Sequence, residues 1–147
     1  MFKNKKIIVI SPHPDDETLG AGGFISKLVK EKNKIKILTV SGHLPPLYKK
    51  EDYELTISEA VKAYEVLGIK DYAFMNIPAT FVRDEPISKL NGEISSFFEE
   101  FQPQIVLCPF PDRHIDHRVI FDSVMVASRP VGVGKKIELL AAYETLS

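Results

Sequence analysis

The sequence predicts an α/β fold, in which helices cover both faces of a mainly parallel sheet of about five strands. Short apolar runs rich in β-branched residues alternate with stretches in which apolar residues recur at helical spacing. Residues 6–10 form a continuous apolar run, which is typical of a strand buried on both faces of a parallel sheet. Because strand and helix alternate through the whole chain, the expected architecture is an α/β sandwich.

Each element has its own signal in the sequence. Gly68 follows the second helical stretch, where a C-terminal cap is expected, and Pro103 stops the third. Ligands of such sheets bind beyond the carboxyl ends of the strands, so the loops that follow the strands are the first places to search for a site. Strands are predicted over 6–10, 35–40, 72–77, 104–108 and 136–143, and helices over 22–32, 55–67, 88–101 and 117–127.

Length and composition exclude several classes of protein. The 147 residues, 44% of them hydrophobic, fit one domain over 1–147 with a self-sufficient core. A net charge of −1 without a basic block argues against a nucleic-acid binder. Cys108 is the one cysteine, so no intramolecular disulfide is possible, and we expect it to be a core residue. The apolar runs are too short for a signal peptide or a membrane span, which predicts a cytoplasmic protein.

Two segments concentrate groups that can do chemistry. Residues 11–18, directly after the first predicted strand, place one imidazole and three carboxyl groups within five positions. Residues 112–117, after the fourth strand, hold two imidazoles and two carboxylates. Because parallel strands end at the same edge of a sheet, we expect these two distant segments to meet.

Two imidazoles and one carboxylate that leave a coordination position open form the layout of a catalytic zinc site. We therefore predict that His13, Asp16 and His117 hold a divalent metal, either Zn²⁺ or another ion such as Fe²⁺. Zinc lowers the pKa of a bound water to about 7, so a neighbouring carboxylate, Asp15, could remove its proton. His114 would lie beside the open position, where in its protonated form it could stabilise an oxyanion or donate to a leaving group.

Several of these residues also have a purely structural interpretation. Asp15, Asp16 and Glu17 could cap a helix and oppose its dipole, which is the role expected of Glu17. His43 follows the second strand and could be a solvated loop residue or a substrate contact. Glycines within 20–23 do not fit G-x-G-x-x-G, and no acidic residue ends the second strand, which excludes a dinucleotide cofactor. These glycines are expected to let the helix pack closely on the sheet.

At these residues the sequence closely resembles the LmbE-like (PIG-L) family of zinc-dependent N-deacetylases. The marks of that family are a His-Pro-Asp-Asp-Glu motif after the first strand and a later His-x-Asp-His motif, which stand here at 13–17 and 114–117. The resemblance extends to the glycine-rich stretch 20–23 and to residues 127–130 and 143–145. It implies a Rossmann-like three-layer sandwich and the three metal ligands already named.

The resemblance also implies the remaining roles and the substrate. Asp15 would be the general base, His114 would stabilise the oxyanion or assist as an acid, and Asp116 would support the histidines from behind. The implied substrates are small N-acetylated amino sugars or their conjugates, resembling N-acetylglucosamine, which would be cleaved to a free amine and acetate. A homo-oligomer is left open, and no membrane or nucleic acid is expected as a partner.

Some alternatives stay open. Three arginines could contact a sugar or phosphate, or could simply form surface ion pairs: Arg83, Arg113 and Arg129. Family members usually continue past the segment corresponding to 143–145, whereas this sequence stops at Ser147. An inactive, truncated domain that binds a metal or a partner is therefore an alternative to the enzyme. An iron(II) oxygenase is a third hypothesis, although its two-histidine, one-carboxylate triad usually occurs in β-rich folds.

Overall fold

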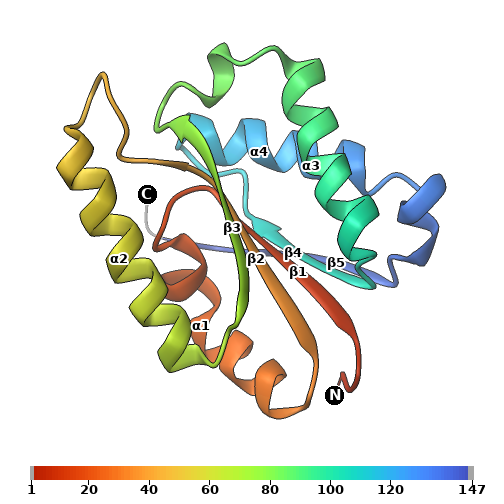
Figure 1. Ribbon diagram of the computed structural model, residues 1–147. Coiled ribbons are helices and arrows are strands. Elements are labelled where there is room, and N and C mark those ends of the chain that lie inside the picture. The colour runs from red at the N-terminus through yellow and green to blue at the C-terminus, as the bar shows by residue number, and fades with distance from the viewer. Residues whose placement is uncertain (1, 146–147) are drawn as a thin grey trace.

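A computed structural model describes residues 2–145 as one parallel sheet with helices on both faces (Figure 1). The strands are β1 (Lys6–Ser11), β2 (Lys34–Gly42), β3 (Asp71–Pro78), β4 (Ile105–Pro109) and β5 (Leu139–Tyr143). The helices are α1 (Asp16–Lys30), α2 (Lys50–Leu67), α3 (Ile87–Phe101) and α4 (Ile115–Ala127), with short 3₁₀ segments at Val82–Asp84 and Gly132–Lys136. The α/β class and the five strands are confirmed, and all four strand pairs are parallel.

The order of the strands creates a switch point at the centre of the sheet. The strands lie in the order β3-β2-β1-β4-β5, so the chain builds outward from β1 in one direction and then returns to add β4 on the other side. The loops that leave β1 and β4 therefore diverge to opposite faces, and a crevice opens between them. This topology brings the two motif-bearing loops together.

Two apolar layers hold the sheet between its helices. Alternate residues of each strand point to opposite faces, so Ile8 and Ile10 pack under α3 and α4, while Ile7 and Val9 pack under α1 and α2. Figure 1 shows α1 and α2 on one side of the sheet and α3 and α4 on the other. Cys108 is fully buried in the first of these layers, as predicted. Within residues 2–145, no helix is both long and apolar enough to cross a membrane.

Three predicted boundaries were wrong by several residues. Helix α1 begins at Asp16 rather than near residue 22, with Asp15 as its N-cap residue. Helix α2 begins at Lys50 rather than residue 55, because its polar first turn is closed by a hydrogen bond from the Lys49 backbone N–H to Asp52 Oδ2 at 3.0 Å. Strand β5 is shorter than predicted, since the chain before it turns as a 3₁₀ segment.

The glycine-rich stretch lies inside α1 and not at its start, and one of its glycines has a specific role. A Cβ at Gly20 would lie 2.5 Å from the carbonyl oxygen of Glu144 and 2.6 Å from Cδ2 of Tyr143. A Cβ at Gly23 would meet nothing within 4 Å. Gly20 therefore allows the chain after β5 to cross directly over the first turns of α1. The expected close approach exists, but its partner is this C-terminal segment.

Candidate metal centre

The residues of the two motifs meet at the carboxyl ends of β1 and β4. His13 lies in the short loop between β1 and α1, and Asp16 occupies the first turn of α1. His117 lies in the first turn of α4, so the fold brings it to the same place from the other side of the sheet. Asp16 and His117 are buried, with 5% and 2% of their surfaces exposed. The convergence expected from the topology is therefore present.

The three proposed ligands present their atoms to one point. His13, Asp16 and His117 each offer one ligand atom, and these atoms lie within 4.8 Å of one another. Oδ2 of Asp16 is 3.0 Å from Nδ1 of His13 and 3.2 Å from Nε2 of His117. A second group, which combines His13 with His114 and Asp116, meets the same 4.8 Å limit.

A carboxylate lies behind each of the two ligand histidines. Oδ2 of Asp116 is 3.1 Å from Nε2 of His13, on the side of the ring away from Asp16. Oδ2 of Asp112 is 2.8 Å from Nδ1 of His117, again on the far side. Such carboxylate partners fix the orientation of a metal-binding imidazole and increase its basicity. Asp116 was expected to support the histidines, and its contact with His13 fits that role. Asp112 was not predicted to contact His117.

Further hydrogen bonds hold one supporting carboxylate, Asp116, and the proposed ligand Asp16 in place. The backbone N–H of Thr80 donates to Oδ2 of Asp116 at 2.7 Å, and the hydroxyl of Thr145 donates to Oδ1 of Asp16 at 3.2 Å. Neither threonine was predicted as a site residue. Thr80 comes from a segment without a motif, whereas Thr145 lies in the stretch 143–145 that resembles the family but was given no role. The signal for Asp112 was available, since it lies in the same loop as His114 and His117.

Glu17 has a structural position, as expected. Its side chain is fully buried and accepts hydrogen bonds from the hydroxyls of Ser11 and, at 2.7 Å, Thr18. The hydroxyl of Ser11 also lies 2.6 Å from the carbonyl oxygen of His13. Burial raises the pKa of Glu17, and the hydrogen bonds from both hydroxyls act in the opposite direction. Glu17 therefore anchors the loop that carries His13.

Asp15 and His114, the two residues predicted to act beside the metal, line a surface pocket together with the three proposed ligands. Asp15 is exposed there, and its pKa is raised by partial burial and by the adjacent negative charge of Asp16. His114 lies beside both proposed ligand rings, with its centroid 4.7 Å from that of His13 and 4.9 Å from that of His117. Its Nδ1 accepts the backbone N–H of Asp116 at 3.2 Å, so a neutral His114 carries its proton on Nε2.

Close packing of opposite charges shifts the pKa values of the ligands. Burial alone would lower the pKa of His13, but the hydrogen bonds to Asp116 and Asp16 outweigh it and raise this pKa to about 9. Burial would likewise raise the pKa of Asp16, whereas the two histidines hold it well below its usual range. The pKa of His114 is lowered by burial and by the positive charge of His13, which favours the neutral form over the protonated form that we expected.

The residues present fit a divalent metal. Two imidazole nitrogens and one carboxylate oxygen form a donor set that suits zinc and other transition metals. Asp16 and Asp116 are both buried, and buried carboxylates require a compensating positive charge. Oδ1 of Asp116 is also buried without a hydrogen-bond partner among the described residues. In the metal-free protein the histidines would have to provide this charge by taking up protons, which is what their raised pKa values indicate.

The three proposed ligands are among the residues that line a pocket of about 200 Å³. His43 lines it and stacks on Tyr48, with ring centroids 4.2 Å apart. The three arginines that we considered for substrate binding are exposed and are not among the residues that line it. Arg83 lies 3.8 Å from Asp84, and Nε of Arg129 donates to the carbonyl oxygen of Val126 at 3.2 Å. Tyr48 was not predicted as a pocket residue.

The chain is similar to known deacetylases over the segment that contains both motifs. Residues 8–128 match the PIG-L family, described as GlcNAc-PI de-N-acetylase. A probable N-acetyl-alpha-D-glucosaminyl L-malate deacetylase 2 of Bacillus anthracis is 25% identical over 92% of this chain and 65% of its own length. The diacetylchitobiose deacetylase of Thermococcus kodakarensis is 30% identical over 78% of this chain and 45% of its own length.

A solved structure shows the same fold. The conserved protein TT1542 of Thermus thermophilus superimposes with a TM-score of 0.78 at 22% identity, over 97% of this chain and 67% of the other. The chain spans about half to two thirds of the length of the curated relatives that it matches. The family match covers both motifs and every residue of the candidate metal centre except Thr145. This chain belongs to the PIG-L family.

Proposed function

We propose that this protein is a metal-dependent N-deacetylase that removes the acetyl group from an N-acetylated amino sugar or its conjugate. The observation that carries the proposal is the convergence of His13, Asp16 and His117 within 4.8 Å below an open pocket. Membership of a de-N-acetylase family and deacetylases among the relatives support this reaction class. An N-acetylglucosamine conjugate is the proposed substrate.

We propose His13, Asp16 and His117 as the ligands, in preference to the group that includes His114 and Asp116. Both ligand histidines already have their other ring nitrogen next to a carboxylate. In the other group, Nδ1 of His114 already accepts the backbone N–H of Asp116 and lies 4.0 Å from Oδ2 of Asp116. Zinc is the proposed ion, and when bound it would supply a water of lowered pKa and polarise the amide carbonyl.

Asp15 is the proposed general base. It is adjacent in sequence to the ligand Asp16 and lines the same pocket, so its carboxylate can accept a proton from the attacking water. Its raised pKa brings it closer to neutrality, where a base can both accept a proton and pass it on. The proton would then go to the departing amine.

His114 is the proposed electrophilic group. Because its Nδ1 is occupied by the Asp116 backbone N–H, its Nε2–H is free to donate to the carbonyl oxygen as negative charge develops there. This role requires only the neutral imidazole. Asp116 would act as a positioning residue, since it holds both His13 and the backbone turn that presents His114.

The sugar itself would lie toward His43 and Tyr48. Their stacked rings form one wall of the pocket, and Tyr48 is 39% exposed, which leaves its surface available to a ligand. Aromatic walls with a few polar groups are common in small-molecule sites. We therefore propose both His43 and Tyr48 as substrate contacts.

The test is release of acetate from N-acetylglucosamine conjugates by zinc-loaded protein. We expect Asp15→Asn to lower the rate by about 10²–10⁴-fold while zinc content stays unchanged. Asp122→Asn is the matched control, because Asp122 is an exposed residue of α4 outside the pocket, and it should keep the wild-type rate. A wild-type protein that holds zinc but releases no acetate would contradict the proposed activity and favour a binding domain. An Asp15→Asn variant with full activity would contradict the assignment of the base.

A further inference from the structure

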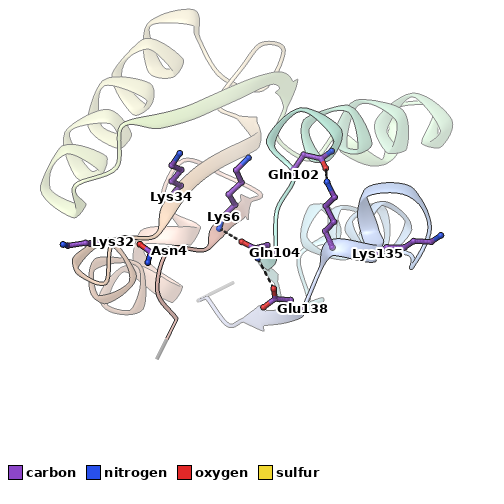
Figure 2. Close-up of a pocket in the computed structure, with 9 residues that line it drawn as sticks. Asn4, Lys6, Lys32, Lys34, Gln102, Gln104, Lys135 and Glu138 are labelled. Carbon is purple, nitrogen blue, oxygen red and sulfur yellow. Dashed lines mark hydrogen bonds between the residues drawn. The ribbon is translucent and has the colours of Figure 1, made fainter.

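A second, larger pocket lies at the opposite edge of the sheet, at the amino-terminal ends of the strands. Its volume is about 620 Å³, compared with about 200 Å³ above the metal ligands. Most of its lining residues carry a positive charge or an amide (Figure 2). They are Asn4, Lys6, Lys32, Lys34, Gln102, Gln104, Lys135, Lys136 and Glu138.

The central lysines of this pocket lack a carboxylate partner. Lys6 and Lys34 are register partners at the starts of β1 and β2, and Figure 2 shows their side chains projecting in the same direction. Within residues 2–145, neither forms an ion pair, and the same is true of Lys32 and Lys135. The one carboxylate of the pocket, Glu138, is already bound by Lys5 at 2.7 Å.

This arrangement is unfavourable in the protein alone. Like charges that face each other on neighbouring strands destabilise a sheet. The next lysine on the same face of β2, Lys36, shows the usual solution, because its ammonium lies 3.5 Å from carboxylates of both Asp71 and Glu100. Among the described residues, the ammonium of Lys6 has the ring of Phe101 at 5.9 Å and no carboxylate within ion-pair distance. No carboxylate of the described residues compensates the charges of Lys6 and Lys34, so an anion bound between them would relieve their repulsion.

We propose that this pocket binds a small molecule that carries one or more phosphate groups. Two ammonium groups that project from adjacent strands can bind one phosphate from the same side, since such charge-assisted hydrogen bonds are strong. Lys136 adds a third cation at the wall, where its ammonium is fixed by Oε1 of Gln102 at 2.6 Å and has further N–H groups to donate. The concave shape and the size favour a compact ligand of this kind. None of its lining residues belongs to the metal centre, so this inference is independent of the proposed deacetylase activity.

The test uses inorganic pyrophosphate as the probe. Metal-free protein is titrated by calorimetry at constant ionic strength, so that chelation of metal contributes no heat. We expect saturable binding that Lys6→Gln combined with Lys34→Gln weakens by at least about tenfold, because two charge-assisted contacts are lost. Lys62→Gln removes an exposed lysine of α2 that forms no ion pair with any described residue, and it should leave the affinity unchanged. His117→Ala should also bind pyrophosphate normally, which would locate the ligand away from the metal centre.

A measurement of stability without any anion separates the proposal from its main alternative. If the lysines served only to offset the negative ends of α1 and α3, the double variant would melt at a lower temperature than the wild type. We expect instead an equal or higher melting temperature in the absence of anion, and a rise with pyrophosphate in the wild type alone. Three results would overturn the proposal. The double variant could bind pyrophosphate as tightly as the wild type does, or the wild type could give no more binding heat with pyrophosphate than with sodium chloride at equal ionic strength. The third is a double variant that melts at a lower temperature than the wild type without anion.

Discussion

The two edges of this sheet carry charge in opposite ways. At the carboxyl edge, His13, Asp16 and His117 contact one another, and each histidine has a further carboxylate behind it. At the amino edge, Lys6 and Lys34 are register partners, and neither forms an ion pair with another of the described residues. The carboxyl edge is thus a network whose geometry is fixed before a ligand arrives, whereas the amino edge is a pocket whose charge is left uncompensated.

The two edges differ in how completely their charged side chains are paired within the protein. Preorganised donors and acceptors are what a catalytic metal site requires, because the ligands must not rearrange during the reaction. A pocket that only binds an anion needs net charge and access, which flexible lysines provide. Substitutions of single residues at either edge can test this comparison.

The largest expected effect is the dependence of stability on pH in the metal-free protein. The pKa of His13 is raised from 6.5 to about 9, so its contribution to the free energy of unfolding is complete below pH 6.5 and is lost as the pH rises to about 9. The expected loss over this range is about 3 kcal/mol, since each pKa unit corresponds to about 1.4 kcal/mol. Urea unfolding at several pH values measures it. His13→Gln should remove the part of this dependence that comes from His13 and leave that of His117, whose pKa is also raised. A wild-type stability that stays constant from pH 6.5 to 9 would show that the carboxyl edge is not charge-paired.

The second effect concerns the support of His117. Asp112→Asn should weaken zinc binding by about 10–100-fold, because the carboxylate that orients and polarises the imidazole is replaced by a neutral amide. Competition with a chromophoric chelator measures this affinity. Asp122→Asn, at an exposed position of the following helix, serves as the control and should bind zinc as the wild type does. Equal affinity of both variants would mean that the contact at 2.8 Å has no influence on the metal.

The third effect tests how tightly the carboxyl edge is packed. Gly20→Ala should lower the free energy of unfolding by about 1–3 kcal/mol, because the added methyl group would overlap the backbone of Glu144. Gly23→Ala, one turn further along the same helix, should raise it by up to about 1 kcal/mol, since alanine favours the helix and meets no neighbour there. Thermal unfolding of the two variants gives the comparison. A neutral Gly20→Ala would indicate that the C-terminal segment does not rest on α1.

The smallest effect belongs to the amino edge. Lys34→Gln should change the free energy of unfolding by only about 0.2–1 kcal/mol, and in the stabilising direction, because it removes a like charge opposite Lys6. The stabilisation should disappear at high salt, where the repulsion is screened. Lys62→Gln should be neutral in both conditions. A destabilised Lys34→Gln variant would show that this lysine has a partner in the folded protein.

Much of the carboxyl edge could be predicted from the sequence, because its chemistry is concentrated in two short motifs at strand ends. The ligand set and the positions of Asp15 and His114 follow from those motifs and from the parallel topology. Thr80 and Tyr48 could not be predicted in this way, since each reaches the site through tertiary structure and has no local pattern. Thr145 lies in the resembling stretch 143–145, but only the fold shows its contact with Asp16. The start of α1 was misjudged because glycines lower helix propensity, whereas here the close approach of Glu144 requires one of them.

The amino edge illustrates the opposite limit. Its lysines come from three separate parts of the chain, and isolated lysines in a sequence are ordinarily solvated surface residues. Only the register of β1 with β2, and the turn that brings Lys136 beside Gln102, assemble them into a pocket. A net charge of −1 for the whole chain also hid this local concentration of positive charge.

The central claim is that two distant loops bind one divalent ion through His13, Asp16 and His117. Its most direct test is a calorimetric titration of metal-free protein with zinc, compared with that of the His117→Ala variant. We expect one ion per chain for the wild type and a loss of affinity of more than a hundredfold for the variant. A wild-type protein without a stoichiometric site, or a His117→Ala variant that binds zinc equally well, would contradict the account.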